Sequence, residues 1–198
     1  MMRRHRFERP KLGILASGRG SNMLALLKAI RRGNLPAEIT VVVSDKADAP
    51  VLDAARKNGI HAHSVSGLNA RIRDSVVSEV MKRHQVDVVV LAGYNKLIKE
   101  PLLRAYADRI INIHPVPLPE FGGKGMHQEA AHQAVLDSGR KMSGPTVHLV
   151  NEEYDKGEIL DHVEVPVEPG DTAETLAARV LPVEHDLYWR VIRRHFCK

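Results

Sequence analysis

The sequence has little of several residue types, and each shortage excludes a class of protein. Cys197 is the single cysteine among 198 residues, which excludes an internal disulfide and a cysteine-built zinc site. No apolar run approaches the roughly 18 residues of a membrane-spanning helix, and no signal-peptide core precedes Lys11. We therefore expect a cytoplasmic protein with no membrane partner.

Aromatic residues are also scarce, with three Phe, four Tyr and one Trp. A track that stacks nucleic-acid bases needs more of them, so no nucleic-acid partner is expected. The formal net charge of +5 instead favours small anionic ligands such as phosphates or carboxylates. Part of that charge comes from residues 1–10, which carry four Arg against one Glu and are interpreted as a basic, solvated N-terminal tail. Residues 11–198 are then expected to form a single domain.

The first glycine-rich stretch lacks the marks of the better-known nucleotide loops. An apolar run, Leu12 to Ala16, leads into Ser17-Gly-Arg-Gly-Ser-Asn22 and then a helical pattern. Met23 stands where a dinucleotide fingerprint needs its third glycine, and the Gly-Lys-Ser/Thr of a P-loop is absent. The small hydroxyl and amide groups that remain suit a terminal monophosphate at a helix N-terminus. A tight turn without a ligand fits this stretch equally well.

Apolar runs and helical patterns alternate along most of the chain. The runs predict strands at 12–16, 37–43, 60–65, 86–92, 110–114, 146–150 and 159–167. The intervening patterns predict helices at 23–30, 50–57, 71–84, 101–107, 127–136 and 176–196, the last with an interruption at Pro182. Such alternation implies an α/β protein, with a mostly parallel sheet between two helical layers. The last two strands, joined by a short loop, should be antiparallel.

Polar side chains appear where one buried strand ends. The run Ile110 to His114 contains Asn112 and is followed by three prolines within five residues, which forbid further strand pairing. Alternate residues of a strand share a face, so Asn112 could donate a hydrogen bond while His114 holds or transfers a proton. A strand end with a satisfied core histidine is the simpler alternative.

A histidine that acts at neutral pH needs a carboxylate to favour its imidazolium form. The turn between residues 150 and 159 offers four candidates: Glu152, Glu153, Asp155 and Glu158. On spacing alone, this acidic turn could equally be solvated. Eleven histidines raise the question of a metal, but His61 with His63 and His127 with His132 lack a matching carboxylate or cysteine set. No metal is therefore expected.

Several of these stretches together resemble phosphoribosylglycinamide formyltransferases, the folate-dependent transformylases of purine biosynthesis. The similar stretches are residues 17–22, 88–93, 112–115, 118–119, 148–150 and 155–157, and the resemblance covers about residues 11 to 195. It implies a three-layer Rossmann-like formyltransferase fold with an antiparallel C-terminal strand. It also implies transfer of the formyl group of 10-formyltetrahydrofolate, as co-substrate, to the amine of glycinamide ribonucleotide, by a monomer or weak homodimer.

The resemblance assigns roles to individual residues. The catalytic residues would be Asn112, His114 and Asp155. The residues that bind the ribonucleotide would be Gly20, Ser21, Asn22 and Glu184. The residues that bind folate would be Arg71, Asn95, Lys96, Leu97, Ile98, Asn112, Asn151, Glu152 and Tyr154. Ala70, Asn95 and Leu181 depart from the residues common in the family.

Three other functions are alternatives to formyl transfer to glycinamide ribonucleotide. A formyltetrahydrofolate deformylase would use the same three residues with water as nucleophile, but it normally carries an N-terminal regulatory domain. A methionyl-tRNA formyltransferase would need a domain after the catalytic one. A nucleotide-binding module without catalysis predicts that substitutions at His114 and Asp155 are tolerated, whereas an enzyme predicts that they are not.

Overall fold

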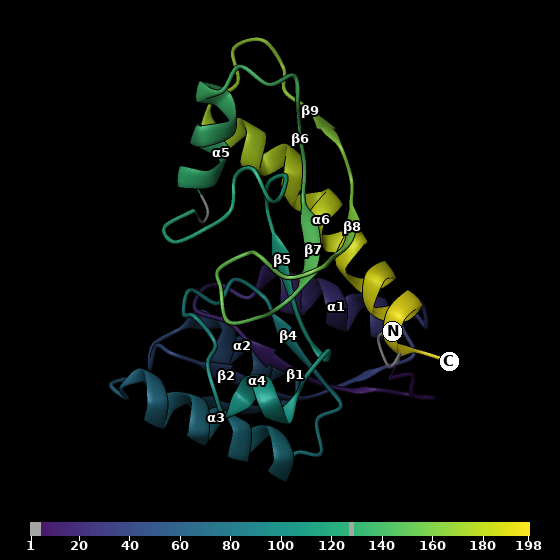
Figure 1. Cartoon of the computed structure of the whole chain (residues 1–198). Helices are drawn as coiled ribbons and strands as arrows, with labels where there is room; N and C mark the ends of the chain where they lie inside the picture. Colours follow the sequence, from purple (N-terminus) through teal and green to yellow (C-terminus); the bar gives the residue numbers. More distant parts are fainter. Residues whose placement is uncertain (1–4, 127–128) are drawn as a thin grey trace.

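The computed structural model describes residues 5–126 and 129–198 and is built on one central sheet (Figure 1). The sheet has the strand order β3-β2-β1-β4-β5-β7-β8. Its strands are β1 (Lys11–Leu15), β2 (Glu38–Ser44), β3 (His61–Ser64), β4 (Val88–Leu91), β5 (Ile110–His114), β7 (Thr146–Leu149) and β8 (Ile159–His162). The first five are parallel, while β7 runs antiparallel to both β5 and β8. The predicted mostly parallel α/β sheet is confirmed.

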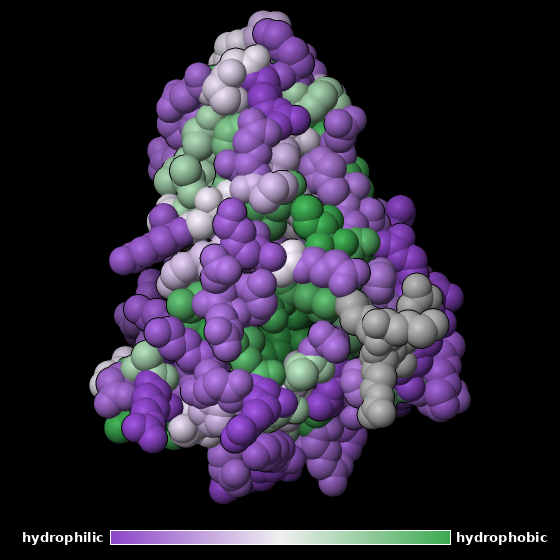
Figure 2. Space-filling model, viewed as in Figure 1, coloured by the Kyte–Doolittle hydropathy of each residue, from purple (hydrophilic) through white to green (hydrophobic). Residues whose placement is uncertain are grey.

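Helices cover both faces of this sheet. They are α1 (Ser21–Arg31), α2 (Pro50–Lys57), α3 (Ala70–Arg83), α4 (Leu102–Ala105), α5 (Glu129–Asp137) and α6 (Ala173–Phe196). Alternate residues of the β-branched strands point to opposite faces, so one hydrophobic cluster packs under α1, α2 and α6 and a second under α3 and α4. A third cluster joins α5 to the first half of α6. Figure 2 shows apolar side chains across the middle of one face, between more polar ends.

Helix α6 packs both on the central sheet and on α5. It begins at a capping box, in which the hydroxyl of Thr172 accepts from the N–H of Thr175 and the hydroxyl of Thr175 accepts from the N–H of Thr172. The buried Tyr188 hydroxyl reaches the carbonyls of Leu91 and Ile111, at 2.8 and 3.2 Å. The helix is continuous through Pro182, so the interruption expected there is wrong. Over the described residues, no helix combines the length and apolarity needed to cross a membrane.

Two predicted elements differ from those observed. The strand expected at 159–167 divides into β8 and β9 (Val165–Pro166), and β9 pairs with β6 (Met142–Ser143) in a separate two-stranded sheet. The chain turns away from the main sheet where the Val163 carbonyl packs against Gly144, so closely that no Cβ would fit there. The helix expected at 101–107 is the single turn α4. The start of the helix predicted at 127–136 lies outside the described residues, and α5 covers the rest.

The part of the N-terminal tail that the structure describes contacts the other end of the chain. The N–H of Phe7 donates to the carbonyl of Phe196 at 2.8 Å, and the N–H of Lys198 donates to the carbonyl of Phe7 at 2.9 Å. The Phe7 ring packs on the cluster under α6. Phe7 therefore lies against the end of α6, while Arg6, Glu8 and Arg9 beside it are exposed.

Candidate active site

The end of β5 delivers its two polar side chains to one face of the sheet. Ile111 and Ile113 belong to the cluster under α6, so Asn112 and His114, which alternate with them, face the opposite side. His114 is only 4% exposed, and Asn112 is half-buried. This agrees with the arrangement predicted from the sequence.

The turn between β7 and β8 brings a carboxylate onto the same face. Oδ1 of Asp155 lies 3.8 Å from Nδ1 of His114 and 3.5 Å from Nδ2 of Asn112. The other three acidic residues of the turn, Glu152, Glu153 and Glu158, are exposed. The structure therefore selects Asp155 from the four carboxylates that the sequence left open. Its backbone φ of 56° is in the left-handed region, which few residues other than glycine adopt.

Asp155 is held in its ionised form. Burial is the largest influence on its pKa and acts to raise it, but hydrogen bonding to His148, the charge of His114 and the N–H of Gly123 together outweigh burial. The pKa of Asp155 therefore lies below its ordinary value, and the group is a carboxylate at neutral pH. A buried carboxylate surrounded by ring nitrogens can stabilise positive charge on an imidazole.

His148 is a member of this cluster that sequence reasoning did not assign to the site. Its Nε2 lies 3.0 Å from Nδ2 of Asn112 and 3.4 Å from Oδ1 of Asp155, and its Nδ1 lies 2.7 Å from the carbonyl of Leu149. With the proton on Nδ1, Nε2 accepts from Asn112; in the imidazolium form, Nε2–H faces the carboxylate. The missing signal was the antiparallel register, which places His148 directly opposite Asn112.

The loop after β5 closes over the cluster. Nε2 of His114 lies 3.0 Å from the carbonyl of Phe121, and the N–H of Gly123 donates to Oδ2 of Asp155 at 2.9 Å. Between them, Gly122 packs so tightly that an added Cβ would lie 2.9 Å from the Cβ of Asp155 and 2.6 Å from Cδ2 of Leu118. The loop at 121–123 therefore contacts the candidate catalytic residues directly.

The glycine loop lies at the carboxyl end of β1. Gly20, the N-cap of α1, has a φ of 82°, and a Cβ there would lie 2.5 Å from Cγ2 of Val51. Glycine is thus required for the turn itself, whatever the loop binds. Because bulk at Gly20 would strain the fold, the neighbouring Ser21 hydroxyl is the better place to test phosphate binding.

Asn22 connects this loop to α6. Its Nδ2 donates to Oε1 of Glu184 at 3.0 Å, and both side chains are buried. Burial raises the pKa of Glu184 to about 7, an effect that the Asn22 hydrogen bond only partly opposes. The Oδ1 atom of Asn22 has no hydrogen-bond partner among the described residues. A buried acceptor in this position is suited to a donor from a ligand.

The segment expected to bind folate follows β4. The N–H of Asn95 donates to the hydroxyl of Ser17 at 3.0 Å, which joins this segment to the glycine loop. Lys96 is exposed and lies 3.8 Å from the carboxylate of Asp45. Leu97 is half-buried, and Ile98 is a core residue that is 1% exposed. A folate contact by Ile98 would therefore have to use its backbone.

On α3, the structure separates two arginines. Arg71, the predicted folate contact, is exposed. Arg73 is buried, pairs with Asp74 at 2.7 Å and donates to the carbonyl of Leu97 at 2.8 Å. Asp74 in turn accepts from the N–H of Lys99 at 2.7 Å. This pair, which was not predicted, fixes the 95–99 segment.

The remaining predicted folate residues lie in the turn before Asp155. Asn151 and Glu152 are exposed, and Tyr154 is half-buried. The side chain of Asn151 accepts from the N–H of Glu153 at 3.0 Å, so it shapes the turn. These residues can contact a ligand on the same face as the Asp155 cluster.

Together, the fold and this cluster define a class of protein: an open α/β enzyme with a buried imidazole and a half-buried amide and carboxylate at the carboxyl edge of its sheet. A comparison with family models agrees, because residues 10–192 match the model described as formyl transferase. The chain belongs to the formyl transferase family.

Within this family, the chain is similar to proteins named phosphoribosylglycinamide formyltransferase. The chain is 42% identical over 192 residues, 95% of its length, to the chloroplastic phosphoribosylglycinamide formyltransferase of Arabidopsis thaliana, and 43% identical over 189 residues, 93% of its length, to that of Vigna unguiculata. It spans 66% and 60% of those two proteins. The phosphoribosylglycinamide formyltransferase structure from Brucella melitensis is 41% identical, with a TM-score of 0.86 over 94% of this chain and 95% of that one.

A formyltetrahydrofolate deformylase structure from Pseudomonas syringae is also similar. It is 28% identical, with a TM-score of 0.85, and the alignment covers 94% of this chain and 61% of the deformylase. The deformylase is a more distant relative than the transferases.

Proposed function

We propose that the protein transfers the formyl group of 10-formyltetrahydrofolate to the amine of N1-(5-phosphoribosyl)glycinamide, a step of de novo IMP biosynthesis. The observation that carries the proposal is the cluster of Asn112, His114 and Asp155, with 3.5 Å from the carboxylate to the Asn112 amide and 3.8 Å to the His114 ring. The names of the relatives indicate the acceptor, phosphoribosylglycinamide, and the formyl group, whereas the folate donor is what the resemblance implies. Residues 11–198 would form the formyltransferase domain.

The reaction would begin with attack of the substrate amine on the formyl carbon, which places negative charge on the formyl oxygen. The Asn112 amide would donate a hydrogen bond to that oxygen, and the positive charge of His114 would stabilise it. A single donor of this kind contributes about 3 kcal/mol to lowering a barrier. Asp155 would hold His114 as the imidazolium and accept the amine's proton, directly or through water. The proton then passes to the folate nitrogen, the nitrogen–formyl bond to folate breaks, and neutral tetrahydrofolate leaves.

The substrates would approach this cluster from two sides. Gly20, Ser21 and Asn22 would hold the ribonucleotide phosphate at the N-terminus of α1, and Glu184 would contact the sugar-glycinamide part. Folate would lie along the 95–98 segment and the turn at 151–154, with Arg71 at the rim. Neither substrate role needs a metal, and a cytoplasmic location stays a prediction.

The test is an assay with purified protein, glycinamide ribonucleotide and a 10-formyl folate analogue, in which folate release is followed by absorbance. We expect release only when the ribonucleotide is present, and loss of it in Asn112→Ala and His114→Ala. His63→Ala, a change at an exposed histidine on β3, serves as the matched control. Release without the ribonucleotide would favour the deformylase function, and no release would favour a binding module.

A further inference from the structure

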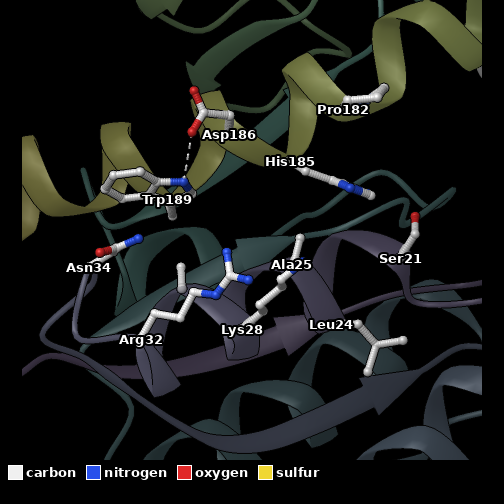
Figure 3. Close-up of a pocket in the computed structure, with 11 residues that line it drawn as sticks. Ser21, Leu24, Ala25, Lys28, Arg32, Asn34, Pro182, His185, Asp186 and Trp189 are labelled. Carbon is white, nitrogen blue, oxygen red and sulfur yellow. Dashed lines mark hydrogen bonds between the residues drawn. The ribbon is translucent and has the colours of Figure 1, made fainter.

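A groove of about 480 Å³ runs between α1 and α6, beside the glycine loop (Figure 3). Helix α1 lines it with residues one turn apart, and so does α6. The lining residues are Ser21, Leu24, Ala25, Lys28, Ala29, Arg32, Asn34, Pro182, His185, Asp186 and Trp189. Small side chains at the centre keep the two helices from filling the space. From Ser21 to Arg32 the groove is about 16 Å long, at 1.5 Å per residue of helix.

The groove has an excess of positive charge. Lys28 and Arg32 are exposed, lie one turn apart on the same side of α1, and make no ion pair in the described part of the chain. Asp186, the acidic residue of the groove, is already paired with Arg190 at 2.8 Å. The pKa of His185 is lowered by burial and by Lys28, so this ring adds no charge at neutral pH. An anionic ligand therefore suits the groove.

An aromatic surface lies across from these cations. Nε1 of Trp189 donates to Oδ1 of Asp186 at 3.1 Å, and the Arg190 guanidinium lies 5.7 Å from the centre of the indole ring. These two contacts fix the plane of the ring before any ligand binds. In Figure 3 the guanidinium of Arg32 points into the space between the helices, on the side where Trp189 lies.

A buried polar atom at the other end of the groove has no partner. Nε2 of His185 is buried and forms no hydrogen bond with any described residue. Since buried polar atoms are nearly always hydrogen-bonded, this nitrogen is suited to a polar group from outside the chain. Figure 3 places its ring between Pro182 and Ser21.

We propose that this groove binds a nucleoside monophosphate, with its phosphate at Lys28 and Arg32 and its base against Trp189. Two cations one turn apart suit a single phosphate group, and an indole suits a base. A free inorganic phosphate would leave most of a groove of this length unfilled. The groove shares Ser21 with the proposed ribonucleotide loop but includes none of Asn112, His114 and Asp155, and the proposal stands whether or not formyl transfer is found.

Trp189 is the single tryptophan, so its fluorescence reports on the groove alone. Titration with AMP, excited where nucleotides absorb little, should give saturable quenching with a dissociation constant below about 1 mM. Adenosine and inorganic phosphate should each bind about tenfold more weakly or worse, because each lacks one of the two contacts. In parallel, the indole N–H signal of Trp189 should shift in NMR spectra with AMP.

Arg31, the last residue of α1, and Arg32, its C-cap, provide a matched pair. Arg32→Ala should weaken AMP binding by at least about tenfold, whereas Arg31→Ala should not, because Arg31 points to Asn58 outside the groove. The proposal is overturned if AMP causes no saturable change, or if Arg31→Ala and Arg32→Ala behave alike. Quenching that Ser21→Ala abolishes and Arg32→Ala leaves intact would also overturn it, since the ligand would then lie in the glycine loop.

Discussion

Two carboxyl groups of the proposed substrate site, the half-buried Asp155 and the buried Glu184, carry opposite pKa shifts. Asp155 accepts from the Gly123 N–H and lies within 4 Å of two histidines and an amide, and its pKa is lowered. Glu184 accepts one hydrogen bond, from Asn22, and its pKa is raised to about 7. Burial acts in the same direction on both. The number of donors and positive charges around each group decides the outcome.

The opposite pKa shifts suit the two carboxyl groups to different roles. A carboxylate that stays ionised can hold an imidazolium and take a proton during a reaction. A carboxyl with a pKa near neutrality can hydrogen-bond a ligand as donor or acceptor, and ligand donors would favour its ionised form. The substitutions below change one side of this comparison at a time.

The largest effect is expected at Asp155. Asp155→Asn removes the charge that favours the imidazolium and the group that accepts the proton, so kcat should fall by about a thousandfold, roughly 4 kcal/mol of barrier. Binding of the two substrates, measured by calorimetry, should change much less, as expected for a group used mainly in the transition state. Glu153→Gln, in the same turn but exposed, is the control. Full activity in Asp155→Asn would remove this residue from the mechanism.

At Glu184 the expected effect is on stability, and it depends on pH. The folded-state pKa of about 7 lies above the ordinary value of 4.5, so between these values the folded protein binds more protons than the unfolded chain. Stability should therefore fall as pH rises through this window, by up to about 3 kcal/mol. Glu184→Gln keeps an acceptor for Asn22 and removes the charge. The variant should unfold at higher denaturant concentration than the parent at pH 8 and at nearly the same concentration at pH 4, below the ordinary pKa of 4.5. Equal stability of the two at pH 8 would contradict the raised pKa.

A smaller effect is expected from the close packing at Gly122. In Gly122→Ala, the new Cβ must displace Asp155 or Leu118, which should lower kcat by roughly ten- to a hundredfold through a shift of the carboxylate. The thermal unfolding temperature should change little, because Gly122 and Gly123 are only half-buried. Adding Leu118→Ala removes the contact between the new Cβ and the Leu118 side chain and leaves the contact with Asp155. If the double variant regained full activity, the loss in Gly122→Ala would come from the clash with Leu118 and not from a shift of Asp155.

Much of the fold and part of the site could be predicted from the sequence. The five parallel strands could be predicted because each is a run of apolar, often β-branched residues, such as 86–92, and this pattern is local in the sequence. The face shared by Asn112 and His114 follows from the two-residue period of a strand. Predictions were weaker where distant backbone contacts decide the structure. The split at Val163 depends on close packing against Gly144, and the selection of Asp155 depends on a turn that curls back over the sheet.

His148 and Arg73 were not predicted for the same reason: distant contacts, which a local sequence pattern does not show, place them at the site. His148 joins the cluster because β7 pairs antiparallel with β5 in one particular register, which periodicity cannot supply. Arg73 is buried beneath the 95–99 segment, while Arg71, two residues earlier, is exposed, because two positions on a helix lie on nearly opposite sides of its axis. Neither assignment changes the proposed chemistry.

The smallest effect is expected at Ser21 in the glycine loop, next to the Asn22 that donates to Glu184. This substitution tests the proposed ribonucleotide site. Ser21→Ala removes one hydroxyl that would donate to the ribonucleotide phosphate, so the affinity for the ribonucleotide should fall about tenfold, the usual consequence of losing a hydrogen bond to a charged group. The affinity for the folate analogue should stay the same, because folate is proposed to bind beyond the 95–98 segment. Calorimetry with each ligand separates the two, and Ser66→Ala, at an exposed serine outside the loop, is the control. If Ser21→Ala and the parent bound the ribonucleotide equally, the hydroxyl would serve only the turn, and the phosphate would have to be held by backbone N–H groups of α1 alone.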